Sequence, residues 1–215
     1  MKKCMLITGA AGFIGSHLCK FYLDKDFFII GIDNFITGKK SNIESFFDNK
    51  NFQFIGQDIR SEIKLRKKID FILHFASPAS PKDYLKYPID TLQTGSLGTE
   101  NILRIAKENK ATVMVASTSE IYGDPMIHPQ DESYFGNVNP IGPRSVYDES
   151  KRYQEALTIA YKNMYELDVR IPRIFNTYGP KLNPDDGRVI SNFIYQALSG
   201  QPLTIYGDGT QTRSF

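Results

Sequence analysis

A turn containing three glycines, Thr8–Gly15 (TGAAGFIG), most constrains the fold of this chain. It lies between an apolar run, Cys4–Ile7, and a stretch with helical periodicity. A short buried strand, a glycine-rich turn and a helix form the entry to a dinucleotide-binding βαβ unit. Gly9 would permit the tight turn, Gly12 would let backbone N–H groups approach a pyrophosphate, and Gly15 would let the helix pack closely on the sheet. A glycine triplet alone is weak evidence, because glycine clusters also mark ordinary turns.

A second apolar run supports the dinucleotide interpretation. Phe27–Ile32 is typical of a strand, and it is followed by Asp33, at the spacing where an acidic residue binds the adenosine ribose hydroxyls. This carboxylate favours NAD over NADP, because it would repel a 2′-phosphate. Lys39 and Lys40 follow closely enough to keep NADP open. The sequence therefore predicts a dinucleotide site, and a purely structural turn is the alternative.

The remaining pattern predicts an α/β fold. Strand-like runs alternate with helical patterns, which is typical of a Rossmann-type, doubly wound parallel sheet with helices on both faces. The expected strands are Cys4–Ile7, Phe27–Ile32, Phe52–Ile55, Phe71–Phe75, Thr112–Ala116, Val169–Phe175 and Leu203–Tyr206. The first expected helix begins near Phe13. The others cover Asn42–Phe47, Lys64–Lys68, Ile89–Asn109, Tyr147–Glu166 and Val189–Leu198. The expected loops include Ala76–Pro81, Ile121–Val146 and Asn176–Gly187.

The length suits one such domain. The 215 residues can bury a core of their own. We expect residues 1–175 to form the nucleotide-binding domain and residues 176–215 to begin a smaller C-terminal substrate-binding lobe. Phe215 resembles the middle of an element, so we also expect this lobe to be truncated.

Charge and composition argue against several other classes. The 26 basic and 24 acidic residues give a net charge of +2 and no sign of a nucleic-acid surface. No stretch is long enough to span a membrane, and a cytoplasmic location is expected. Cys4 and Cys19 are expected in the core rather than in a disulfide. The three histidines lack partners at ligand spacing, so no metal is expected.

Tyr147 and Lys151 form a Tyr-x-x-x-Lys pair at the start of an expected helix, where both side chains lie on one face. A phenol, whose pKa is about 10, is a poor base at neutral pH. A nearby ammonium and a cationic nicotinamide would lower that pKa, and the tyrosine could then accept a proton from a substrate hydroxyl while hydride leaves the same carbon. Thr118 could hydrogen-bond the same hydroxyl. The alternatives are an ordinary amphipathic helix and a threonine that satisfies backbone groups at a strand end.

These motifs resemble the extended short-chain dehydrogenase/reductases that act on nucleotide sugars. The shared blocks are Thr8–Gly15, Ser117–Gly123 and the Tyr147/Lys151 pair. Within this family the chain is most similar to the UDP-glucuronate decarboxylase (UDP-xylose synthase) group. That similarity covers essentially the whole chain and depends on His74–Pro81, Gly123–Pro125, His128–Gln130, Asn139–Arg144, Tyr147–Arg152, Arg173–Thr177 and Asp186–Arg188.

The resemblance implies NAD as the cofactor and a UDP-sugar as the substrate. The implied NAD contacts are Gly9, Gly12, Phe13, Ile14, Gly15, Asp33, Asn34, Thr37, Gly38, Asp58, Ile59, Phe75, Ser77, Thr94, Ala116, Tyr147, Lys151, Thr177 and Arg188. The implied substrate contacts are Ser119, Tyr147, Asn176 and Arg188. Two positions depart from the family pattern: Gly95 replaces a common asparagine, and Gln93 replaces a lysine of the decarboxylases.

Position 119 distinguishes reactions within the family. The related sugar 4,6-dehydratases carry an aspartate there, which protonates a departing hydroxyl, and Ser119 is too weak an acid for that task. The resemblance therefore implies NAD-dependent decarboxylation of UDP-glucuronate to UDP-xylose through a C4-keto intermediate, with NADH recycled in the site. Tyr147 would be the base, and Lys151 would tune it and hold the nicotinamide ribose. Thr118 and Ser119 would position the C4 oxygen and the carboxylate region. Glu120 would position the sugar or manage the proton at C5.

Several alternatives stay open. A 4,6-dehydratase, a 4-epimerase and a non-catalytic NAD-binding fragment share part of the pattern, and Glu120 has the alternative of an exposed loop carboxylate. The long helices Ile89–Asn109 and Tyr147–Glu166 carry apolar residues on more than one face. In the resembled family this surface forms the four-helix bundle of a homodimer, whereas simple packing on the sheet is the alternative.

Overall fold

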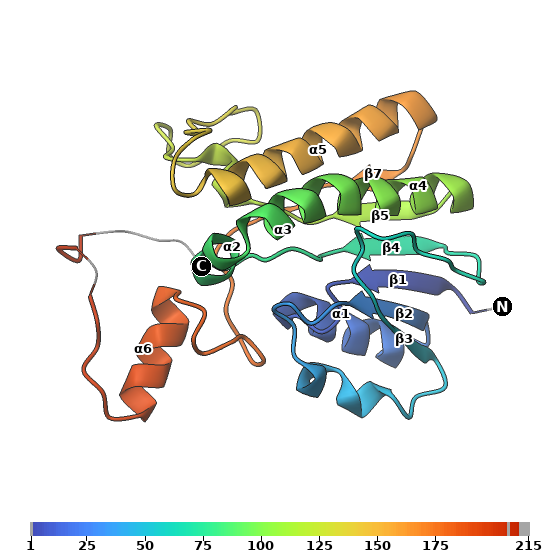
Figure 1. Cartoon of the computed structure of the whole chain (residues 1–215), viewed down its shortest axis with the longest axis horizontal. Coiled ribbons are helices and arrows are strands. Elements are labelled where there is room, and N and C mark those ends of the chain that lie inside the picture. The colour runs from blue at the N-terminus through green and yellow to red at the C-terminus, as the bar shows by residue number, and fades with distance from the viewer. Residues whose placement is uncertain (1, 206, 211–215) are drawn as a thin grey trace.

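The computed structural model describes residues 2–205 and 207–210 and has three layers, a parallel sheet between two layers of helices (Figure 1). Within these residues six parallel strands form the main sheet in the order β3-β2-β1-β4-β5-β7. Their bounds are β1 Cys4–Thr8, β2 Phe28–Asp33, β3 Phe52–Gly56, β4 Phe71–His74, β5 Thr112–Val115 and β7 Val169–Arg170. A smaller parallel pair joins β6 Ser117–Thr118 to β8 Arg173–Ile174. The predicted Rossmann-type doubly wound sheet is confirmed.

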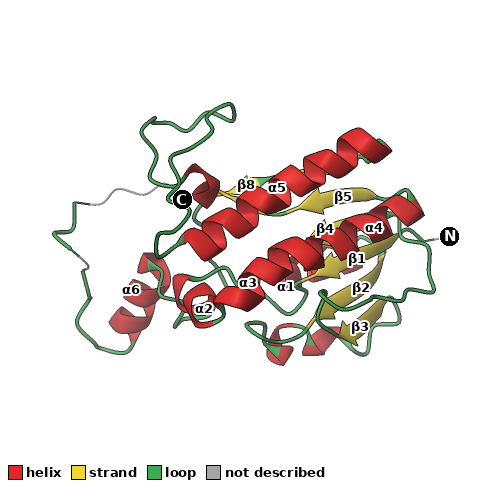
Figure 2. Cartoon of the chain, turned by 45° about the horizontal axis from the view of Figure 1, so that its top comes forward, coloured by secondary structure: helices red, strands yellow, loops and turns green. Residues whose placement is uncertain are grey.

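Each face of the main sheet is covered by its own helices (Figure 2). The helices are α1 Phe13–Asp24, α2 Pro81–Lys86, α3 Pro88–Gln93, α4 Thr99–Asn109, α5 Ser145–Tyr165 and α6 Val189–Leu198. Short 3-10 turns cover Lys40–Asn42, Glu44–Phe46 and Ser119–Tyr122, the last labelled η4, and a π-helical segment, η3, covers Thr94–Gly98. Met5 and Ile7 pack with α1, whereas Leu6 between them packs with α4 and α5. Successive side chains of a strand point to opposite faces of the sheet, and helices cover both faces here. The side chains of β1 are therefore apolar on both faces.

The segment between β3 and β4 is not helical, so the prediction of a helix over Lys64–Lys68 is wrong. Ile63 and Leu65 both pack against the core, at a spacing of two residues that suits extended backbone. Asn42–Phe47 likewise forms no single helix, because the chain there has two short 3-10 turns, Lys40–Asn42 and Glu44–Phe46. The prediction of a strand over Leu203–Tyr206 is wrong for Leu203–Ile205, and Tyr206 and Phe215 lie outside the described residues.

The expected strand Val169–Phe175 is divided into β7 and β8, which belong to different sheets. Pro172 lies between them and has no N–H to donate to a neighbouring strand. An additional helix, α2, begins directly after Ser80, whose Oγ accepts a hydrogen bond from the Asp83 N–H at 3.1 Å. Serine followed by proline is a helix-start signal that the predicted loop Ala76–Pro81 overlooks.

The expected helix Ile89–Asn109 is present as α3, η3 and α4, with a π-helical segment in its middle. There the helix passes very close to α5. A Cβ on Gly95 would lie 2.1 Å from Ser150 Oγ and 3.0 Å from the Ser150 carbonyl oxygen. Ser150 Oγ itself donates to the Thr91 carbonyl at 3.1 Å. Ser150 therefore occupies the space that a side chain at position 95 would need.

Helix α6 lies beyond the carboxyl end of the sheet and is joined to it by irregular segments (Figure 1). None of its residues is buried. Among the residues that the structure describes, no helix has both the length and the apolar character needed to cross a membrane.

We expect Gly95→Ala to lower the free energy of unfolding by about 1–3 kcal/mol, because the new methyl group overpacks the contact with α5. Ser150→Ala removes the nearest atom and should reduce that loss in the double variant. Urea unfolding of the wild type, both single variants and the double variant measures the coupling. Strictly additive effects would contradict this account.

Candidate active site

The glycine turn joins β1 to α1 at the carboxyl edge of the sheet. Gly9 has a φ of +69°, and a Cβ there would lie 2.8 Å from the carbonyl carbon of Phe75. Gly12 is the N-cap of α1, whose first N–H groups have no partner within the helix. A Cβ on Gly15 would lie 2.0 Å from the Gly9 carbonyl oxygen. The close contact at Gly15 is therefore made with the turn itself rather than with the strands.

Asp33, the last residue of β2, binds back to this turn. Its Oδ2 accepts the Ala11 N–H at 2.9 Å, and its Oδ1 accepts the Phe35 N–H at 2.8 Å. Burial raises the pKa of Asp33, and these backbone hydrogen bonds oppose the rise. A Cβ on Gly38 would approach the same carboxylate to 2.9 Å. Asp33 thus has a structural role in holding the turn, in addition to the role predicted for it.

A pocket opens where β1 to β4 end, directly against the turn. The predicted cofactor residues that line it are Gly9, Gly12, Asp33, Asn34, Thr37, Asp58, Ile59, Phe75, Ser77 and Thr94. The pocket is also lined by five residues that were not predicted: Ile32, Ile36, Gln57, Ala76 and Pro78. A turn that requires glycine, a helix N-terminus and an acidic strand end fit a dinucleotide.

A line of buried hydrogen bonds connects the turn to α5. Thr8 Oγ1 lies 2.7 Å from His74 Nδ1, and His74 Nε2 lies 3.1 Å from Thr99 Oγ1. Gln154 donates to Thr99 Oγ1 at 2.9 Å and accepts from Lys151 Nζ at 3.0 Å. All five side chains are buried. We call this set, Thr8, His74, Thr99, Gln154 and Lys151, the buried polar line.

His74 is neutral within this line. Burial and the charge of Lys151 lower its pKa to about 3. The N–H groups of Phe75 and Ala76 donate to Thr8 Oγ1 at 3.2 and 3.3 Å. Because Thr8 accepts these two bonds, we assign its own proton to His74 Nδ1 and the ring proton of His74 to Nε2.

Tyr147 lies in the first turn of α5 with its ring buried. Its ring stacks on that of Tyr84 from α2, with 5.0 Å between centroids and 8° between planes. Burial raises the pKa of the Tyr147 phenol, whereas a hydrogen bond with the Thr118 side chain and the charge of Arg188 act to lower it. Additional positive charge is therefore needed before this phenol can act as a base near neutral pH.

Lys151 lies one helical turn after Tyr147. Its Nζ donates to the Ala116 carbonyl at 2.9 Å and lies 6.0 Å from the centre of the Tyr147 ring. Burial lowers the pKa of Lys151 to about 8. The ammonium is held in place by the Ala116 carbonyl and by Gln154 Oε1.

Ser119 and Glu120 begin η4, directly after β6. The Glu120 N–H donates to Thr118 Oγ1 at 3.3 Å, and its carboxylate forms an ion pair with Arg144. Arg144 also hydrogen-bonds Tyr84, the residue stacked on Tyr147. The Glu120 carboxylate is thus half-buried and ion-paired, and its part in the reaction stays a prediction.

The predicted residues after β8 lie apart from the pocket lining. Thr177 Oγ1 donates to the Phe175 carbonyl at 3.0 Å, and neither Thr177 nor Asn176 lines the pocket. Arg188 pairs with Asp186 at 3.2 Å and donates to the Ala79 carbonyl at 3.1 Å. Arg188 thus connects the start of α6 to the loop that follows β4.

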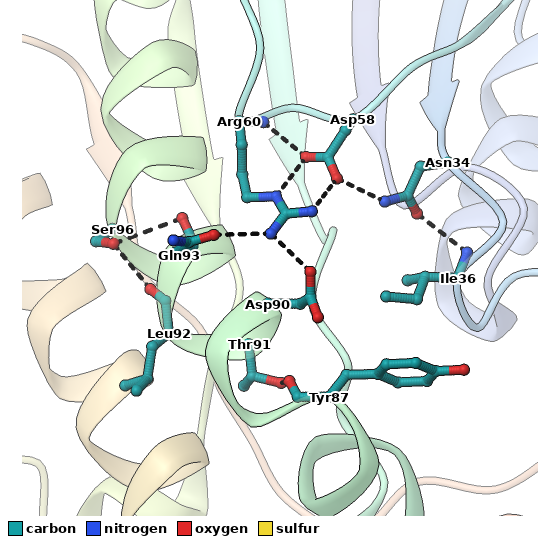
Figure 3. Close-up of polar contacts among 10 residues, drawn as sticks. All are labelled: Asn34, Ile36, Asp58, Arg60, Tyr87, Asp90, Thr91, Leu92, Gln93 and Ser96. Atoms are coloured by element: carbon teal, nitrogen blue, oxygen red, sulfur yellow. Dashed lines mark hydrogen bonds and ion pairs between the residues drawn. The ribbon is translucent and has the colours of Figure 1, made fainter.

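The site also contains four residues that were not predicted: Gln154, Tyr84, Arg144 and Arg60. Gln154 lies three residues after Lys151 on the same helix face, which is a local signal that could have indicated it. Arg60 binds Asp58, Asp90 and Gln93 in a polar network beside the pocket (Figure 3). Asp90 and Gln93 are distant from Arg60 in sequence, so no local pattern indicates the whole network.

The cysteines and histidines outside this site have structural surroundings. Cys4 and Cys19 are buried free thiols, and burial raises the pKa of Cys19 to about 12. His17 Nε2 lies 2.8 Å from the Pro180 carbonyl oxygen. In the described part of the chain, no group of three or more histidine, cysteine, aspartate or glutamate residues is arranged to hold a metal ion.

The chain is similar to known proteins of one family. The sequence profile of the NAD dependent epimerase/dehydratase family matches residues 5–215. UDP-glucuronic acid decarboxylase 1 of Xenopus tropicalis is 50% identical over 214 residues, which cover 100% of this chain and 50% of that protein. UDP-glucuronic acid decarboxylase 4 of Arabidopsis thaliana is 52% identical over 211 residues, or 98% of this chain and 47% of that protein. The chain thus spans about half the length of the curated relatives it matches.

Solved structures with the same fold include two epimerases. The UDP-glucuronic acid 4-epimerase of Bacillus cereus, in complex with UDP-glucuronic acid and NAD, has a TM-score of 0.84 and 34% identity, covering 98% of this chain and 68% of that one. The UDP-N-acetylglucosamine 4-epimerase of Methanobrevibacter ruminantium has a TM-score of 0.88 and 31% identity, covering 99% of this chain and 68% of that one.

The depressed pKa of Lys151 predicts a pH-dependent stability. The pKa is about 8 in the folded chain against an ordinary value of 10.5, so the unfolded chain binds more protons between these values. The wild type should therefore gain stability relative to Lys151→Met as pH rises from about 8 to about 10.5, with a constant difference below that range. Urea unfolding at several pH values measures it, with Lys162→Met on the exposed face of α5 as the matched control. A difference that does not vary with pH would contradict the shift.

Proposed function

The chain belongs to the NAD dependent epimerase/dehydratase family, and from this premise we propose that it catalyses the NAD-dependent decarboxylation of UDP-glucuronate to UDP-xylose. The observation that carries the proposal is the buried Tyr147 phenol, hydrogen-bonded to Thr118, with Lys151 one helical turn away. The decarboxylases of Xenopus and Arabidopsis, each about half identical along the chain, support this substrate over other nucleotide sugars.

The pocket against the glycine turn is the proposed NAD site. Gly9, Gly12 and the start of α1 would hold the pyrophosphate, and Asp33 would bind the adenosine ribose and disfavour a 2′-phosphate. Bound NAD would accept hydride from C4 of the sugar and return it after decarboxylation. The other predicted contacts that belong to this proposal are Phe13, Ile14, Gly15, Asn34, Thr37, Gly38, Asp58, Ile59, Phe75, Ser77, Thr94, Ala116, Tyr147, Lys151, Thr177 and Arg188.

In the proposed reaction Tyr147 accepts the proton of the C4 hydroxyl while the C4–H bond is broken, which leaves a C4 ketone. Thr118 orients the hydroxyl by a hydrogen bond, and the Lys151 ammonium favours the phenolate. The bond between C5 and the carboxylate then breaks, and its electron pair moves toward the C4 ketone oxygen as carbon dioxide leaves. A proton is added at C5, and Tyr147 finally returns its proton to the C4 oxygen.

Ser119 and Glu120 adapt the site to this reaction. A serine hydroxyl cannot protonate a departing hydroxyl, which argues against the 4,6-dehydratase alternative. Glu120 would position the sugar or manage the proton at C5, and its ion pair with Arg144 fixes the direction of the carboxylate. Asn176 and Arg188 would contact the nucleotide sugar, as the first residues of a substrate-binding lobe over residues 176–215 that follows the NAD-binding domain of residues 1–175.

A homodimer in the cytoplasm completes the proposal. The segments α3–α4 and α5 lie side by side over one face of the sheet (Figure 2). Their outer surfaces expose Leu92, Leu97, Tyr153 and Ile159 to solvent. A second copy packed there would form a four-helix bundle and remove these apolar side chains from water.

Product analysis tests the reaction. The full-length protein is incubated with UDP-glucuronate and NAD, and carbon dioxide and the sugar nucleotide are measured. Release of carbon dioxide with UDP-xylose is expected. Inversion at C4 without carbon loss would indicate an epimerase, and a 4-keto-6-deoxy product from a dTDP- or GDP-hexose would indicate a dehydratase. NAD binding without any product would leave a non-catalytic module.

Tyr147→Phe removes only the proposed proton acceptor. We expect turnover to fall by about 10²–10⁴-fold, because general base catalysis is lost, whereas NAD should still bind and its dissociation constant should change far less than turnover. Tyr165→Phe, near the far end of the same helix, is the matched control. Undiminished turnover in Tyr147→Phe would rule out its assigned role.

The dimer is tested by mass in solution. Size-exclusion chromatography with light scattering should give twice the chain mass for the wild type and a single chain mass for Leu97→Glu, because a buried unpaired carboxylate is costly. Leu198→Glu on α6, away from this surface, is the control. A monomeric wild type would contradict the dimer alone.

A further inference from the structure

Gln154 places a side-chain amide in the protein interior, between α5 and the start of α4. The residue is only 2% exposed, so the polar atoms of its side chain need partners within the protein. Its Nε2 donates to Thr99 Oγ1 at 2.9 Å, and its Oε1 accepts from Lys151 Nζ at 3.0 Å. An apolar side chain of similar size would fill the same space without the cost of burying an amide. Packing alone therefore does not account for a glutamine at this position.

The orientation of this amide follows from the hydroxyl that it contacts. Thr99 Oγ1 accepts the ring proton of neutral His74, whose Nε2 lies 3.1 Å away. The hydroxyl proton of Thr99 is directed to the Thr94 carbonyl oxygen at 3.4 Å. With its proton used there, the hydroxyl can only accept from Gln154, so the amide nitrogen faces Thr99 and the amide oxygen faces the ammonium. His74 and Thr99 together thus place an acceptor, and not a donor, beside Lys151.

Two acceptors determine how the Lys151 ammonium is oriented. Nζ donates to the Ala116 carbonyl at 2.9 Å and to Gln154 Oε1 at 3.0 Å. An ammonium carries three N–H groups in a tetrahedral arrangement, so two fixed acceptors also fix the direction of the third N–H group. Without the amide oxygen, the ammonium could turn about its remaining hydrogen bond to Ala116.

The titratable groups around this ammonium are neutral or already paired. Burial lowers the pKa of Lys151 to about 8. On β4, burial and the charge of Lys151 lower the pKa of His74 to about 3, so this ring carries no charge near neutral pH. On α5, burial raises the pKa of the Tyr147 phenol, and the Glu155 carboxylate pairs with Arg173 at 3.0 Å. The charged form of Lys151 therefore depends on its two uncharged oxygen acceptors.

We propose that Gln154 is a positioning residue that keeps the Lys151 ammonium charged and fixed in one direction. The proposal rests on the proposed function, in which this ammonium favours the Tyr147 phenolate. Gln154 is not among the residues that line the pocket, so it acts through Lys151. Because the effect of an ammonium on a phenol depends on its charge and its position, losing the amide oxygen should weaken that effect.

Two variants of nearly the same size separate this role from packing. Gln154→Met keeps the volume and removes the acceptor, while the Ala116 carbonyl stays in place. The charged form then loses a hydrogen bond, so the pKa of Lys151 should fall by about one pH unit. Gln154→Glu instead places a carboxylate beside the ammonium and should raise that pKa by about 1–3 pH units. A side chain that only fills space would not give opposite shifts.

The experiment measures the pKa of Lys151 directly. The full-length protein, with its lysines isotope-labelled at the ε carbon, is titrated by NMR, and the signal that disappears in Lys151→Met identifies this lysine. Gln53→Met and Gln53→Glu, at an exposed position of β3, are the matched controls and should leave the pKa of Lys151 unchanged. Melting temperatures of all the variants establish that folded proteins are compared.

The pH profile of kcat, measured with UDP-glucuronate and NAD, provides the functional measurement. Activity should be lost at alkaline pH as Lys151 loses its proton. This alkaline limb should move to lower pH in Gln154→Met and to higher pH in Gln154→Glu, with little change in KM.

An unchanged pKa of Lys151 in both Gln154 variants, or a shift in the same direction in both, would overturn the proposal. An alkaline limb of kcat that does not follow the NMR titration would overturn it as well. Opposite shifts of the pKa in a protein that forms no UDP-xylose would overturn the proposed function and leave the action of Gln154 on Lys151 intact.

Discussion

The buried polar line is the constraint on which the arrangement of the site depends. It passes through the protein interior, where a polar group that loses its partner costs about 1–3 kcal/mol, so each member fixes the next. Thr8 lies at the start of the glycine turn and Lys151 lies on α5, so the line joins segments that are far apart in the sequence. The pocket wall and the Tyr147 helix therefore keep a fixed relation through hydrogen bonds rather than through apolar packing alone.

Two neighbouring strands of the main sheet, β5 and β7, are interrupted at the same level. This interruption positions the groups that contact Tyr147 and Lys151. β5 stops before Ala116 and β7 stops before Pro172. The backbone continues from these two strands into the smaller sheet, as β6 and β8 respectively. The Ser117 N–H donates to the Pro172 carbonyl at 2.9 Å across the new pair. Because β6 leaves the main sheet, Thr118 reaches Tyr147, and the Ala116 carbonyl at the break accepts the Lys151 ammonium.

The parts of the site that sequence could predict are those encoded locally. The glycine turn, Asp33 and the Tyr147/Lys151 spacing depend on short-range geometry, and the structure brings the first two into one pocket. The residues that were missed obtain their partners through the topology. Arg60 meets Gln93, and Gln154 meets Thr99, only after the sheet has placed distant segments together. The wrong helix over Lys64–Lys68 has the same cause, since tertiary packing overrides the local pattern there.

The π-helical segment η3 contains the equivalent of one inserted residue, and this sets the rotational phase of everything that follows it. Thr94 before it lines the pocket, whereas Thr99 after it joins His74 in the interior. If this segment were a regular α-helix with the same number of residues, α4 would be rotated by about 100° about its axis. Ile102 and Ala106 would then turn away from the sheet, so the extra residue lets one continuous helix serve the ligand at one end and the core at the other.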